Sequence, residues 1–475
     1  MNPSTTIRTR LTSRILGFAA GLGLAAGMVL GCSTSVTPGA STNITSAAAT
    51  VPVLITDAPS DQLVSFSLTL NSIVLTDAAG KTASILPSAT TIEICHLNGI
   101  QAPLVTASIP EDTYTSATIT FSSPAITYIN SAGQAVVASP TLATTSFNFT
   151  FPTPGFTVNN TSTSLLIDLL AAQSVTISGT TVTVTPVFSL KPVPPATAVP
   201  PQGQNGTGMQ QMGTVVSVSG TTLVIEPGSG PNFTLTTNSA TVLQGFSSLS
   251  ALTAGELVQV DFIVQTGGVY LATRIQLAPP PPNGAPANLI SGPVTSLVAG
   301  TGFKMALMQG AGPGVAPTSA GTIVTVTTSS STVYAITPQF VSLSGLPFTP
   351  AFTAANLTAG QTVGVVTSAL TSTTATATNV YLVPQTVNGT VTAITTSGAW
   401  TAYTYTLASG SAFSSLSGAT TITVYTGTAT APPLNATAPP AIAVGSTARF
   451  NGLIFNTGSG FKMVAGVCPD GAPGI

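Results

Sequence analysis

The chain has 475 residues, of which 43% are hydrophobic and only 4% are charged. Three of the nine basic residues lie in the first 14 positions, so the rest of the chain has six basic against eleven acidic residues. No basic stripe remains to neutralise phosphates, which excludes a nucleic-acid partner. The mean hydropathy of +0.51 excludes a disordered chain. After Leu30 no apolar run is long enough for a membrane-spanning helix.

Residues 1–31 are typical of an export signal. Arg8, Arg10 and Arg14 precede an uncharged, apolar, small-residue run over 15–30. The motif Val29-Leu30-Gly31-Cys32 then resembles a lipobox, in which the cysteine becomes the lipidated first residue of a lipoprotein. The alternative is an ordinary signal peptide cut near Ala25 or Gly31. Either interpretation predicts export, and the first predicts a membrane anchor at Cys32.

The exported part has the composition of an all-β protein. Thr alternates with Val, Ile or Leu, which suits half-buried strands, and helix formers such as Glu, Lys and Arg are nearly absent. After a small-residue tether over 32–50, strands at roughly ten-residue spacing predict a β-sandwich over 51–193. A Pro- and Gly-rich stretch over 194–212 then predicts a linker.

Three internal repeats follow the linker, at 213–278, 289–384 and 387–470. Each opens on a Gly-x-Val motif, and each later contains Leu-x-x-Gly-x-x-Val or a close variant, centred on Gly255, Gly360 and Gly445. We expect positive φ at these glycines. About six short strands per repeat are too few for a sandwich and predict a small β-barrel.

The repeats share glycines and apolar positions but no charges. Asp261 aligns with Val366 and Asn451, and Arg274 aligns with Asn379 and Gly466. A chemistry common to the three would need common polar groups, so the shared pattern indicates a fold and not a site.

Two family resemblances cover most of the exported chain. The sandwich region resembles the domain of unknown function numbered 4382 in four ordered motifs: Ile55-Thr56-Asp57-Ala58-Pro59, Ile109-Pro110-Glu111-Asp112-Thr113-Tyr114, Leu166-Ile167-Asp168-Leu169-Leu170 and Leu190-Lys191-Pro192-Val193. The repeats resemble the domain of unknown function numbered 5666. Both resemblances imply β domains in exported or lipid-anchored bacterial proteins, and neither implies an activity.

His96 is the one histidine, so any histidine-dependent catalysis or metal binding needs it. It follows Cys95 in a predicted strand over 91–97, where neighbouring side chains point to opposite faces. We therefore expect no joint role for Cys95 and His96.

Asp57 and Asp61 are the best candidates for a metal site. With Asp77 or Asp168 they could hold Ca²⁺, which takes several oxygen ligands. The competing interpretation is that Asp57 caps a turn before Pro59 and that Asp61 is solvated.

Trp400, Tyr403 and Tyr405 form the densest aromatic group and are candidates for stacking on a sugar. In a regular strand, however, Trp400 faces away from Tyr403 and Tyr405. Core packing is therefore the favoured interpretation.

Together these features predict a non-catalytic cell-envelope lipoprotein with a structural, adhesive or interaction role, anchored through lipid. Ser33 after the cysteine favours the outer membrane of a double-membraned bacterium. The alternative is a carbohydrate-binding protein, with or without Ca²⁺, and after it a metal-assisted hydrolase centred on Asp57 and Asp61. An envelope protein or a glycan is the expected partner.

Overall fold

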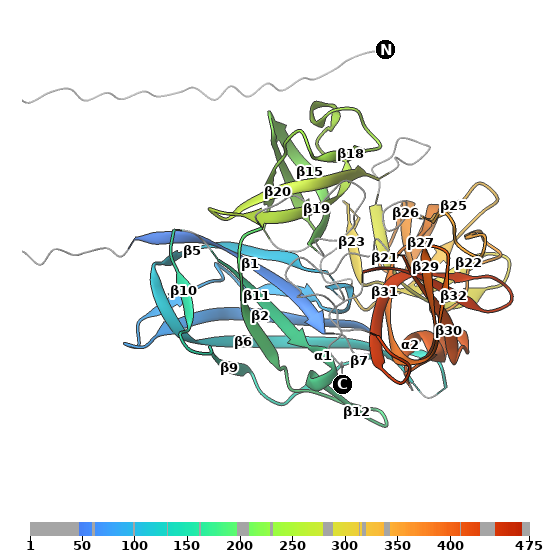
Figure 1. Cartoon of the computed structure of the whole chain (residues 1–475), viewed down its shortest axis with the longest axis horizontal. Helices are drawn as coiled ribbons and strands as arrows, with labels where there is room; N and C mark the ends of the chain where they lie inside the picture. The colour runs from blue at the N-terminus through green and yellow to red at the C-terminus, as the bar shows by residue number, and fades with distance from the viewer. Residues whose placement is uncertain are drawn as a thin grey trace, which may run out of the picture. The chain divides into compact units, whose positions relative to one another are not determined.

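The computed structural model describes most of the chain after residue 46. The ranges are 47–58, 62–97, 100–130, 132–160, 163–196, 209–228, 231–278, 288–312, 314–315, 320–336, 343–408, 410–427 and 442–467. These residues lie in one compact unit. Of the described residues, 62% are in strands and 4% in helices, which confirms the all-β fold (Figure 1). Within the described ranges no helix is long and apolar enough to span a membrane.

The first domain is the predicted sandwich. One sheet has the order β14-β11-β1-β5, with bounds Phe188–Val193, Ser164–Leu170, Ala48–Ala58 and Ala102–Pro110. The other is built on β10 (Phe156–Val158), β6 (Asp112–Ile129), β2 (Leu63–Asp77) and β3 (Thr82–Ser84), with β4 (Thr90–Glu93), β7 (Ala135–Ala138) and β9 (Ser146–Thr150) beside them. One apolar cluster joins residues of both sheets.

Three short elements complete the first domain. Helix α1 (Ala171–Ser174) follows β11, and a small sheet joins β12 (Val175–Ser178), β13 (Thr181–Val184) and β8 (Thr141–Leu142). Strand β1 begins three residues inside the predicted tether, where Ala48 lies opposite Pro110.

The three repeats are closed five-stranded barrels, as predicted. Barrel 1 contains β15 (Gln210–Ser219), β16 (Thr222–Pro227), β17 (Phe233–Thr236), β19 (Leu257–Gln265) and β20 (Val269–Leu277). Barrel 2 contains β21 (Asn288–Val298), β22 (Gly302–Ala306), β24 (Ile323–Thr327), β26 (Thr362–Leu370) and β27 (Thr374–Leu382). Barrel 3 contains β28 (Gln385–Ser397), β29 (Trp400–Leu407), β30 (Thr421–Gly427), β31 (Thr447–Asn456) and β32 (Phe461–Val467).

Each ring runs in the order first, second, third, fifth, fourth strand, with the third and fifth strands parallel. This is the Greek-key order of the OB-fold. The shorter elements lie outside the rings. They are β18 (Val242–Gln244), η2 (Leu249–Ala251), β23 (Gln309–Ala311), β25 (Val333–Ile336) and α2 (Ala412–Ser417).

The Leu-x-x-Gly element forms the same corner in every barrel. The φ angles of Gly255, Gly360 and Gly445 are 92°, 91° and 89°, which confirms the predicted left-handed conformation. Each glycine N–H donates to a carbonyl in the barrel's first strand, on Val215, Val294 and Val391 respectively. The three repeats therefore share backbone geometry at this corner.

The domains also share buried apolar contacts. Leu54 of β1 is fully buried in the same cluster as the core of barrel 1, and Leu166 packs against that cluster. Another cluster joins the barrel 2 core to Trp400, Tyr425 and Phe455 of barrel 3. Barrels 2 and 3 are thus joined by common core packing as well as by the chain.

Candidate functional site

Glu93 ends strand β4 and organises the turn that follows. Its Oε1 accepts hydrogen bonds from the backbone N–H groups of Phe66 and Cys95, at 3.0 and 3.1 Å, and from the Ser65 hydroxyl at 3.1 Å. Its Oε2 accepts from the His96 backbone N–H at 2.8 Å and lies 3.0 Å from the ring Nδ1. Glu93 is 7% exposed, so these contacts replace the water that the carboxylate loses on burial.

The predicted strand over 91–97 is wrong beyond Glu93. Residues Cys95–Leu97 form a 3-10 helix instead. The carboxylate of Glu93 binds the two N–H groups that would continue the ladder, so the side chain competes with the strand. Sequence reasoning missed Glu93. The signal that could have found Glu93 is its position three residues before the one histidine.

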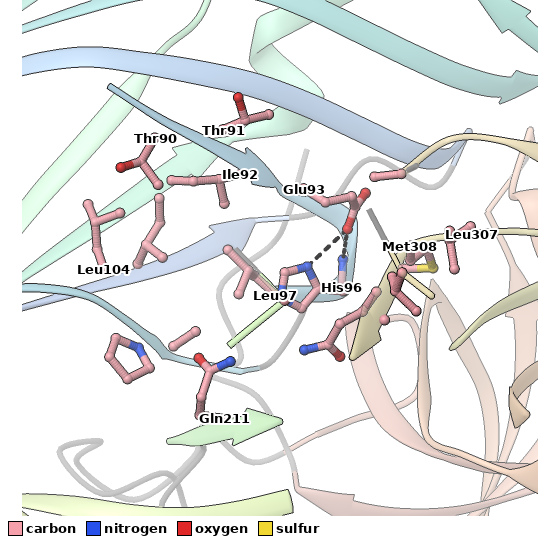
Figure 2. A pocket seen from close by; sticks show the side chains of 18 residues that line it. Thr90, Thr91, Ile92, Glu93, His96, Leu97, Leu104, Gln211, Leu307 and Met308 are labelled. Atoms are coloured by element: carbon pink, nitrogen blue, oxygen red, sulfur yellow. Dashed lines mark hydrogen bonds and ion pairs between the residues drawn. The ribbon is translucent and has the colours of Figure 1, made fainter. Parts of the chain in front are cut away.

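His96 lines a cavity of about 70 Å³. Figure 2 shows its ring beside Glu93, with Thr90, Gln211 and Met308 also around the cavity. The His96 side chain is 18% exposed. A carboxylate on Nδ1 fixes the orientation of an imidazole and leaves Nε2 to a ligand or a proton.

Among the described residues, the ring of His96 is hydrogen-bonded to Glu93. His96 makes no hydrogen bond there to a hydroxyl or a thiol, and acyl transfer requires such a nucleophile. Cys95 is buried, and burial together with the charges of Glu93 and Asp57 raises the pKa of its thiol well above the usual value. A thiol held in its neutral form is a poor nucleophile.

Asp57 lies at the end of β1 and is 4% exposed. Among the described residues, neither of its carboxylate oxygens has a hydrogen-bond partner of normal geometry. Burial raises its pKa well above the usual value, the charges of Asp168 and Glu93 raise it further, and Arg449 and the Ala171 backbone lower it. Burial thus shifts the Asp57 carboxyl toward its protonated form. The turn before Pro59 that Asp57 was expected to cap lies outside the described residues, so that expectation stays a prediction.

The calcium hypothesis stays a prediction. Asp61, its second ligand, lies outside the described residues. Among those that are described, no group of three His, Cys, Asp or Glu side chains could hold a metal ion. Cys32, the predicted lipidation site, also lies outside the described ranges, as does Cys468, the third cysteine of the chain.

The aromatic group of β29 is divided between two cores. Tyr405 is fully buried inside barrel 3, and the ring of Tyr403 packs on Phe450 with centroids 5.4 Å apart. Trp400 is 4% exposed and belongs to the core shared with barrel 2, where its Nε1–H donates to the Ser344 carbonyl at 3.3 Å. These positions fit core packing, and sugar binding by the three residues stays untested.

Barrel 1 carries a polar group that the other barrels lack. The Arg274 guanidinium bonds to one carboxylate oxygen of Asp261, and Gln210 Nε2 donates to the other at 3.0 Å. At the matching ladder positions, barrel 2 pairs Val366 with Asn379. In barrel 3 the partner of Asn451 is Val467, one residue beyond the Gly466 expected from the sequence. The barrels thus repeat their backbone without repeating this ion pair.

Two family models match the chain. Residues 48–192 match Domain of unknown function (DUF4382), and residues 212–276 match Domain of unknown function (DUF5666). The second match covers barrel 1, and barrels 2 and 3 have the same strand order. No curated protein and no solved structure matches the chain.

Proposed function

We propose that the protein is a non-catalytic lipoprotein of the bacterial cell envelope, anchored through Cys32 at the outer membrane. In this proposal the sandwich and the barrels serve as a structural, adhesive or interaction surface. The partner is an envelope protein or a glycan.

The single observation that supports a non-catalytic role best is the way the barrels repeat. Their corner glycines share one backbone conformation, whereas the polar pair of Asp261 and Arg274 is absent from the matching positions of barrels 2 and 3. Catalysis by proton transfer needs positioned titratable groups. Barrels that repeat the same backbone without repeating titratable groups suit a role as contact surfaces.

The anchor is tested by Cys32→Ser in the native host. We expect the protein to move from the membrane fraction to the soluble fraction, because no lipid can be attached. Ser33→Asp is the companion variant, since the residue after the cysteine is the basis of the outer-membrane assignment. Membrane association that survives Cys32→Ser would contradict the anchor.

The partner is tested with the exported chain lacking the lipid. We expect it to cosediment with isolated envelopes, and to do so equally at low and at 1 M salt, because only 4% of its residues are charged. A glycan array with and without Ca²⁺ tests the alternative. Selective, Ca²⁺-dependent glycan binding that is lost in Asp57→Ala would favour the carbohydrate-binding protein.

A further inference from the structure

Barrel 2 contacts barrel 3 through its Leu-x-x-Gly corner, residues 353–361. Gln361 is fully buried, and its Nε2 donates to the Ile454 carbonyl at 2.8 Å. Asn356 Nδ2 donates to the Asn456 carbonyl at 3.1 Å. Both acceptors lie on β31, so two side-chain amides of one barrel bind the main chain of one strand in the next.

An aromatic contact lies beside these hydrogen bonds. The ring of Phe348 packs on Tyr425 and Phe455, with centroids 5.4 and 5.8 Å away. The Lys462 ammonium lies 4.7 Å from the centroid of the same ring. The side chain of Trp400 closes this region through its bond to Ser344. The contact thus combines directional hydrogen bonds with buried apolar area, as a specific interface does.

The corners of the other barrels have the same internal bond but lack the outward amide donors. The residue after the glycine accepts a backbone N–H in every barrel. The accepting side chains are Glu256, Gln361 and Ser446, at 2.6, 2.8 and 3.1 Å from nitrogen to oxygen. Gln361 keeps an N–H₂ group for a neighbour, whereas the second oxygen of Glu256 can only accept and Ser446 has a single short hydroxyl.

The residue at the position of Asn356 also differs between the barrels. In barrel 1 the matching residue is Ala251, whose side chain has no hydrogen-bonding group. The glycines differ in their surroundings as well. A Cβ built on Gly255 or Gly445 meets nothing within 4 Å, whereas one on Gly360 meets Phe413 of α2. The corner of barrel 2 therefore differs from that of barrel 1 at two residues, Asn356 and Gln361, and its glycine is in addition the one that a neighbouring barrel approaches.

We propose that this corner is a docking face for another barrel of the same fold, and that Asn356 and Gln361 are the residues that determine which barrel can dock. The occupant is barrel 3 of the same chain, which presents the Ile454 and Asn456 carbonyls beside an aromatic wall. Barrels 2 and 3 then form one cooperative module. Barrel 1 cannot dock in this way because Ala251 and Glu256 supply no donor.

The docking also covers a surface that barrels of this topology use elsewhere. OB-fold barrels bind chain molecules on the face of their second and third strands. In barrel 3 those strands are β29 and β30, and Trp400 and Tyr425 from them are buried in the core shared with barrel 2. Docking thus covers the part of that face formed by Trp400 and Tyr425.

The single tryptophan makes this proposal directly measurable. Trp400 lies in the docking interface, so its fluorescence reports on the interface and on no other part of the chain. The test compares the full exported chain with its Asn356→Ala/Gln361→Glu variant. We expect Trp400 emission of the variant to shift to longer wavelength, and its urea midpoint to fall, while far-UV circular dichroism is retained.

The matched control makes the reverse exchange in barrel 1, Ala251→Asn/Glu256→Gln. It should leave the Trp400 emission and midpoint of the exported chain unchanged. If the double variant does not fold, Gln361→Glu alone replaces it in the test. Its urea midpoint should also be lower than that of wild type. A urea midpoint, followed by Trp400 emission, that equals the wild-type value in both the double variant and Gln361→Glu would overturn the proposal. An equal shift in the barrel 1 control would overturn it too.

Discussion

Gly360 lies directly against Phe413, in a position where no larger residue fits. A Cβ at Gly360 would come within 2.9 Å of Phe413 Cδ2 and 3.1 Å of its carbonyl oxygen. Two conditions therefore require glycine at this position: its φ of 91° and the close approach of Phe413 of barrel 3. Its counterparts Gly255 and Gly445 meet only the first requirement.

The three glycine-to-alanine variants separate these requirements. Gly255→Ala and Gly445→Ala should each lower the free energy of unfolding by about 1–2 kcal/mol, the cost of a left-handed Cβ. Gly360→Ala should lose a further ~1–3 kcal/mol from overlap with Phe413. Chemical denaturation of the three variants provides the measurement. Equal losses at all three positions would contradict the close contact.

Glu93→Gln should destabilise the first domain by about 2–4 kcal/mol. A glutamine keeps the shape but replaces one acceptor oxygen with N–H₂, which faces donors and leaves buried N–H groups unsatisfied. The exposed Glu226→Gln is the control and should change stability by less than ~0.5 kcal/mol. Denaturant unfolding followed by circular dichroism tests the pair. A Glu93→Gln protein as stable as wild type would show that the carboxylate network is not needed.

Asp57→Asn should change how stability depends on pH. The raised pKa means that the folded state keeps the Asp57 proton to a higher pH than the unfolded chain. Between the two pKa values the folded state binds more protons, so the free energy of unfolding falls as pH rises. Asn carries no charge at any pH and lacks this loss.

The measurement for Asp57 is a series of thermal unfolding curves from pH 4 to pH 8. The variant should be at least as stable as wild type at pH 8, and its advantage should shrink toward pH 4. The exposed Asp112→Asn is the control for a surface carboxylate. An advantage of Asp57→Asn that grows toward pH 4 would show that the buried acid is ionised and partnered in the folded state.

Tyr405→Ala should unfold barrel 3, whereas Tyr403→Ala should weaken it. Tyr405 is fully buried, and its hydroxyl donates to the Ala448 carbonyl, so truncation leaves a cavity and an unpaired carbonyl. We expect a loss of about 3–5 kcal/mol. Tyr403 is half-buried, and its loss should be about 1–2 kcal/mol. Limited proteolysis within residues 385–467 follows both variants, and equal protection of the two would contradict the assignment of Tyr405 to the core.

Local patterns were enough to predict the barrels. The corner glycines were recognisable because a left-handed residue recurs at a fixed place in a fixed apolar frame. The separation of Trp400 from Tyr405 followed from the two-residue period of a strand. Both are properties of neighbouring residues, which a sequence displays directly.

Contacts between distant segments were not predictable in this way. The run Val53-Leu54-Ile55 indicated a strand, but that Leu54 is buried by barrel 1 depends on a partner about 200 residues away. Such a continuous apolar run is typical of strands covered on both faces, and this signal was available. The hydrogen bonds of Glu93 and the burial of Asp57 both depend on segments that are distant in the sequence. The residue types alone therefore could not show that the two acids have different surroundings.

Barrel closure affects how the number of repeats in such a chain can grow. A surface with few charges offers little mutual repulsion between copies, so any open strand would invite pairing with a neighbour. Each five-stranded ring satisfies its own edges. Gene duplication can therefore add a closed barrel to such a chain without adding an unpaired strand edge.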